Sequence, residues 1–158
     1  MNHADQQVRA FFDALSEAEK RLNKIGYSEF LRLGEREWGQ SRGLGTTHSP
    51  FHIRDERFNR AFTLGSWVRP KGSKQATIIF SVIVARTEEA WFIQSSVEEE
   101  DPEREEMTKW LWDSSEFRTD KVTEAVTMLD QALCDLESSL VKEPVASYLV
   151  ISQTNEEA

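Results

Sequence analysis

The feature that most constrains the fold is the run ATIIFSVIVA, residues 76–85, which is apolar at almost every position. It is far shorter than the roughly 18 residues that a membrane-spanning helix needs, so we expect no membrane insertion. A strand with one face in water would alternate apolar and polar residues. A run that is apolar on both faces instead predicts a central strand covered on each side.

Two further strands are predicted beside this run. Within residues 58–68, Phe58, Phe62, Leu64 and Val68 occupy alternate positions, and PKGSK at 70–74 is typical of a hairpin turn. After TEEA, the segment WFIQSSVEE at 91–99 predicts a third strand. The simplest topology is a three-stranded antiparallel meander, to which VASYLVIS at 145–152 can add a fourth strand.

Apolar residues at three- and four-residue spacing predict helices on both sides of the sheet region. The longest cover residues 4–25, with an apolar stripe that includes Val8 and Phe12, and a segment from about Thr119 to before Pro144. Shorter helices are expected at 28–38 and around 107–112. The predicted fold class is α+β, a three- or four-stranded antiparallel sheet packed with N-terminal and C-terminal helices. We expect a single domain over 1–152 and a frayed polar tail over 153–158.

Cysteine usage and the N-terminus bear on the cellular setting. The one cysteine, Cys134, cannot form an intrachain disulfide, and the first residues lack the basic region and apolar run of a secretory signal. We therefore expect a cytoplasmic protein. Because Cys134 lies between Leu133 and Leu136 in the predicted C-terminal helix, we expect it to be buried rather than reactive.

Charge is distributed unevenly along the chain. The net charge is −9, yet residues 32–74 hold nine Lys and Arg against four Asp and Glu, so this segment carries +5 and the remainder −14. Overall acidity argues against nonspecific binding of polyanions by the whole surface. The basic segment still allows one nucleic-acid or phosphorylated ligand, and its candidate anion-binding residues are Arg54, Arg57 and Arg60.

The run EEEDPEREE at 98–106 has seven acids and one arginine, and KWLWDSSEF follows it closely. If KWLW is helical, its two tryptophans point about 200° apart, so Trp110 would face the core and Trp112 would lie outside beside the acids. This arrangement is either a solvated connector or a docking surface for a basic protein. The candidate partner-binding residues are Glu98, Glu99, Glu100, Asp101, Glu105 and Trp112.

The stretch GTTHSPFHIRDERFNR at 45–60 is the remaining place for chemistry. His48 and His52 have a spacing that suits metal ligands on a helix, but Pro50 lies between them and further ligands are missing. Motifs for nucleophilic catalysis or phosphate binding are absent from the sequence. We therefore predict no metal, no cofactor and no catalytic residue, although either histidine remains possible as a general base.

These observations favour a small intracellular binding or regulatory protein, similar in role to an immunity protein or a chaperone. It would recognise a basic partner protein through the acidic, tryptophan-containing face. The alternative is nucleic-acid or phosphorylated-ligand binding through residues 32–74, and an enzyme that uses the 48–60 loop is a third, weaker interpretation.

Overall fold

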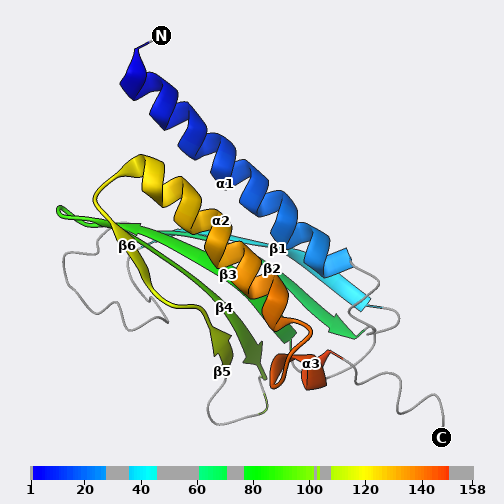
Figure 1. The fold of residues 1–158 in the computed structure, drawn as a ribbon. Helices are drawn as coiled ribbons and strands as arrows, with labels where there is room; N and C mark the ends of the chain where they lie inside the picture. Colours follow the sequence, from blue (N-terminus) through cyan, green and yellow to red (C-terminus); the bar gives the residue numbers. More distant parts are fainter. Residues whose placement is uncertain are drawn as a thin grey trace, which may run out of the picture.

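The computed structural model describes residues 2–27, 36–45, 61–70, 77–101, 103 and 108–149 (Figure 1). Three helices and six strands lie in these ranges. In chain order they are α1 (His3–Tyr27), β1 (Arg36–Gly45), β2 (Ala61–Pro70), β3 (Thr77–Arg86), β4 (Trp91–Glu100), β5 (Thr108–Asp113), β6 (Phe117–Thr119), α2 (Val122–Ser139) and α3 (Val145–Tyr148).

The strands form one antiparallel sheet in the order β1-β2-β3-β4-β5, and β6 pairs with the beginning of β4. The predicted α+β class and the antiparallel pairing are confirmed. The sheet is larger than the three or four strands expected, because β1, β5 and β6 join the predicted meander of β2, β3 and β4.

Helices α1 and α2 lie side by side on one face of the sheet (Figure 1). Alternation along β3 directs Phe80, Val82 and Val84 into the core beneath them. The apolar stripe of α2 faces the same core, where Leu129, Leu133 and Leu136 are buried, as its spacing predicts. Sheet and helices therefore share one core.

The N-terminal part of α1 differs from the sequence expectation. Phe11, Leu22 and Ile25 are buried, but Val8 and Phe12 are 53% and 60% exposed. The first turns of α1 project past the neighbouring elements, so the apolar stripe there has no described sheet surface to cover (Figure 1).

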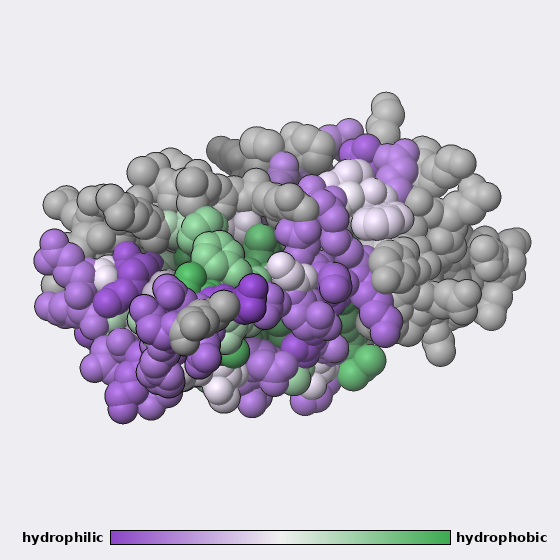
Figure 2. Space-filling view, turned by 90° about the horizontal axis from the view of Figure 1, so that it is seen from above, coloured by the Kyte–Doolittle hydropathy of each residue, from purple (hydrophilic) through white to green (hydrophobic). Residues whose placement is uncertain are grey.

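On the face seen in Figure 2, hydrophobic atoms form a small area within a mostly hydrophilic described surface.

Buried serines attach each long helix to the sheet. The hydroxyl of Ser66 on β2 donates to the carbonyl oxygen of Leu22 in α1 at 2.6 Å. The hydroxyl of Ser95 on β4 donates to the carbonyl oxygen of Ala132 in α2 at 2.7 Å. Both serines are fully buried, so their hydroxyls need these partners.

A polar contact joins the two helices on their outer side. Arg21 of α1 donates to Asp130 at 2.7 Å and also binds Glu137, both on α2. Its guanidinium reaches the sulfur of Cys134 at 3.3 Å. Cys134 is exposed, so the prediction of a buried thiol was wrong. It lies beside the apolar stripe of α2, on the rim where the two helices meet.

Three local predictions were wrong. Residues 36–38, expected at the end of a helix, begin β1, and residues 108–112, expected in a helix, belong to β5. Residues 145–148, expected in a strand, form the short helix α3. In β1 and β5 the backbone forms hydrogen bonds with a neighbouring strand instead of within a helix. A short helix without tertiary contacts is only marginally stable, so strand pairing prevails at these two places.

The second face of the sheet, which we call the distal face, is turned away from α1 and α2. Its residues near the β3–β4 turn form a buried apolar cluster: Ala61, Ile83, Ala85, Ala90 and Phe92. Residues 80–85 of β3 are thus buried on both faces, which confirms the prediction of a strand covered on each side. Within the described parts of the chain, neither long helix has the length and apolarity required to cross a bilayer.

Candidate functional site

The three consecutive glutamates at the end of β4 do not share a face. Strand alternation places Glu98 and Glu100 on the distal face, where they pair with Ile79 and Thr77 of β3. Glu99 points to the helix side, is only 8% exposed, and lies in register with Lys109 of β5. Only Glu98 and Glu100 of these predicted partner-binding residues are therefore presented together.

A β-bulge reverses the expected roles of the two tryptophans. In β5, Trp112 pairs with Val97 and Trp110 with Glu98, so Leu111 has no opposite residue in β4. Without this extra residue, both tryptophans would lie on one face. Trp112 instead packs against the core, whereas Trp110 is 44% exposed on the distal face beside Glu98. The prediction that Trp112 lies outside and Trp110 inside was wrong, because it assumed a helix.

Sheet register aligns a row of side chains across the distal face. Trp67 of β2 lies opposite Ile79 of β3, Ile79 opposite Glu98 of β4, and Glu98 opposite Trp110 of β5. Directly opposed side chains in antiparallel strands are close enough to interact. We call Trp67, Ile79, Glu98, Glu100 and Trp110 the acidic face.

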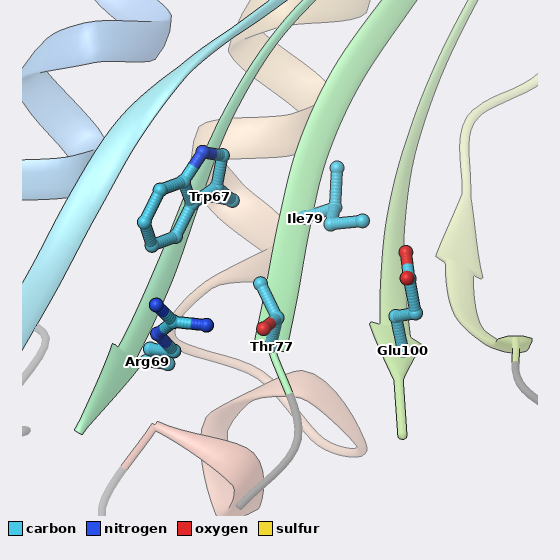
Figure 3. A pocket seen from close by; sticks show the side chains of 5 residues that line it. All are labelled: Trp67, Arg69, Thr77, Ile79 and Glu100. Atoms are coloured by element: carbon cyan, nitrogen blue, oxygen red, sulfur yellow. The ribbon is translucent and has the colours of Figure 1, made fainter. Parts of the chain in front are cut away.

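A hollow of about 310 Å³ opens within the acidic face, lined by Trp67, Arg69, Thr77, Ile79 and Glu100. Figure 3 views it with the helices behind the sheet, so the hollow belongs to the distal face. Trp67 and Arg69 stand on one side and Glu100 on the other, while Thr77 and Ile79 lie between them (Figure 3). One wall is thus aromatic and the opposite wall carries a carboxylate.

The aromatic wall is held by contacts to β1 and within β2. The indole of Trp67 lies over Gly39, its partner in β1. The guanidinium carbon of Arg69 is 5.2 Å from the centre of the Trp67 ring, a cation–π distance. Arg69 also donates to Glu37 through Nε at 2.7 Å. The positive charge of Arg69 is therefore balanced by Glu37.

The two carboxylates on the opposite side have no balancing cation among the described residues. Neither Glu98 nor Glu100 forms an ion pair with any residue that the structure describes. Burial raises the pKa of Glu98 to about 7, and repulsion from the charge of Glu100 adds to the effect. A cation bound between these groups would relieve this repulsion.

Other predicted site residues take no part in this arrangement or lie outside it. Asp101 follows β4 and accepts a hydrogen bond from the backbone N–H of Glu103 at 2.9 Å. Glu105, Arg54, Arg57, Arg60, His48 and His52 lie outside the described residues. Over the ranges that are described, no three His, Cys, Asp or Glu side chains gather as metal ligands would. The expectations for the 45–60 stretch thus remain predictions.

The sequence interpretation did not identify Trp67, Ile79 and Trp110 as site residues. The sequence contained a signal for two of them, because Trp67 and Ile79 alternate with the core residues of their strands and therefore lie on the other face of the sheet. Trp110 had no comparable signal, since its orientation depends on the bulge in β5. Searches of protein-family models, curated proteins and solved structures find no match to this chain.

Proposed function

We propose that the protein binds a basic partner protein through the acidic face. The observation that carries this proposal is the pair of carboxylates, Glu98 and Glu100. They are partly buried on the same face of β4, form no ion pair with a described residue, and are flanked by Trp67 and Trp110. Complementary charge speeds encounter and selects partners. Half-exposed tryptophans supply the apolar contact area that anchors protein interfaces.

The cost of placing Glu98 in this position supports a binding role. Its raised pKa reflects a carboxylate held in partial burial beside a second negative charge. Such an arrangement does not help the isolated fold, and a Lys or Arg from a partner would turn the repulsion into attraction. Perturbed groups of this kind are concentrated at functional sites.

This function places the protein among small cytoplasmic binding or regulatory proteins, such as immunity proteins and chaperones. The described part of the basic segment does not favour the alternative of anion binding. Arg69, which lies in that segment, is already paired with Glu37 and packed against Trp67. An incoming phosphate would have to displace Glu37 and approach Glu100.

The test is affinity capture from the source cells with wild-type protein and the double variant Glu98→Gln/Glu100→Gln. The matched control is Glu88→Gln/Glu116→Gln, which removes the same charge at exposed positions at the other end of β4. We expect a protein rich in Lys and Arg to be enriched by wild type and control, and at least tenfold less by the Glu98/Glu100 variant.

Calorimetry with the purified partner then measures affinity directly. The affinity should fall as salt rises from 50 to 500 mM, because the contacts lie partly in solvent. Capture of no basic protein, or equal capture by the Glu98/Glu100 variant, would contradict the proposal.

A further inference from the structure

We infer that the hollow is the site for one arginine side chain presented by the partner. This inference rests on the proposed function and adds the chemical group that the acidic face recognises. It follows from the size of the hollow, the apolar surfaces of Trp67 and Ile79, and the placement of two carboxylates that form no ion pair among the described residues.

The size and lining of the hollow suit one long side chain. At about 310 Å³ it is at the lower limit of pockets that hold whole small molecules. Trp67 and Ile79 form apolar wall and floor (Figure 3). The methylene stem of an arginine can pack along such surfaces while its charged end remains among polar groups.

The charged end of that side chain would meet Glu100, which lines the hollow, and Glu98 lies next to Glu100 on the same face of β4. These residues are two apart on β4 and point to the same face, so their Cα atoms are about 7 Å apart from the rise of an extended strand. A guanidinium carries five N–H donors in a planar fork and can bond two carboxylates at once. A lysine ammonium offers a more compact charge and lacks a planar surface to stack beside Trp67.

Arg69 does not fill this role itself. Its guanidinium is held on the β1 side of the hollow by Glu37, with Nη2 2.6 Å from Oε2, and by the Trp67 ring. Glu100 lies on the far side of Thr77 and Ile79 (Figure 3). With Arg69 neutralised by Glu37, the other charges that the described residues bring to the site are those of Glu98 and Glu100, which favour a cation.

The experiment titrates ¹⁵N-labelled full-length protein with three capped amino acids: Nα-acetyl-arginine amide, its lysine counterpart and its citrulline counterpart. Citrulline keeps the shape of arginine without the charge. The indole N–H signals of Trp67 and Trp110 report binding and are assigned with Trp67→Phe and Trp110→Phe. We expect the arginine compound to shift the Trp67 signal saturably with a millimolar Kd, and the lysine and citrulline compounds to bind at least fivefold more weakly.

Two variants complete the test. Glu100→Gln should weaken the arginine compound at least fivefold, whereas Glu88→Gln should leave its affinity unchanged. Equal binding of citrulline or lysine, or shifts that leave the Trp67 signal in place, would overturn the assignment to arginine. If the titration fails in this way but capture of a basic partner still requires Glu98 and Glu100, only the assignment to arginine is overturned and the proposed function stands. If the arginine compound binds but no basic partner exists, the proposed function fails instead.

Discussion

Gly39 lies directly beneath the indole of Trp67, its register partner across β1 and β2. A Cβ atom at position 39 would stand 2.7 Å from Trp67 Nε1 and 2.8 Å from Cε2, closer than real Cβ contacts allow. Glycine therefore lets the aromatic ring cover the β1 backbone, an arrangement in which a cross-strand aromatic compensates for a glycine in a strand. The same contact fixes one wall of the hollow.

Gly39→Ala should accordingly displace Trp67 and destabilise the protein by about 1 to 3 kcal/mol, the usual cost of overpacking. Urea denaturation and the Trp67 indole signal would measure the two effects. Gly26→Ala is the comparison, since its Cβ would meet Trp38 Cε3 at 3.1 Å and alanine is the better helix former. A Gly39→Ala protein with unchanged stability and an unmoved Trp67 signal would show that the ring does not depend on this glycine.

Ser66→Ala and Ser95→Ala should each lower the free energy of unfolding by about 1 kcal/mol, because each removes one buried hydrogen bond from the sheet to a helix carbonyl. The two bonds lie on different helices, so the double variant should lose the sum of the two. Chemical denaturation of the four proteins tests this. A clearly smaller combined loss would mean that the two helices detach together.

Leu133→Ala should cost about 2 to 5 kcal/mol, because Leu133 is buried in the core that α2 shares with the sheet. Gln131→Ala, at an exposed position on the same helix, is the matched control and should change stability by less than about 0.5 kcal/mol. If Leu133→Ala lost less than about 0.5 kcal/mol, a different face of α2 would have to pack against the sheet.

The parts of the fold that were predicted have local signals. The helical spacing around Leu22 and Leu133 and the apolar run of β3 repeat at the period of the element they form. β1 has no such signal, because its composition is rich in glycine, and Gly39 is covered by a partner 28 residues away, Trp67. Loop-like composition and strand pairing conflict there, and the nonlocal contact prevails.

The candidate site was predicted only in part for a related reason. The acidic run was identified as a unit, whereas the strand divides it between two faces and buries Glu99. Continuing the alternation of β4 to residue 100 would have separated these glutamates. That Trp110 and not Trp112 faces outward could not be predicted from the sequence, because one inserted residue in β5 decides which ring is exposed.

Glu98 should make the stability of the protein depend on pH. Its pKa in the folded protein is about 7, against 4.5 for an ordinary glutamate, so between these values the folded state binds more protons than the unfolded state. The free energy of unfolding should therefore fall as pH rises from about 4.5 through 7, and this contribution should level off above that range.

Glu98→Gln should remove this contribution, since the amide carries no charge in either state. The variant should be more stable than wild type at pH 8 by an amount on the order of 1 kcal/mol, reduced by the partial exposure of the group, and the difference should vanish near pH 4.5. Urea denaturation from pH 4.5 to 8.5 measures it, with Glu88→Gln controlling for the loss of one negative charge. A Glu98→Gln protein that loses stability between pH 6 and 8 as steeply as wild type would mean that Glu98 does not titrate there. In that case partial burial and the charge of Glu100 would not raise the pKa of Glu98 as the geometry of the acidic face requires.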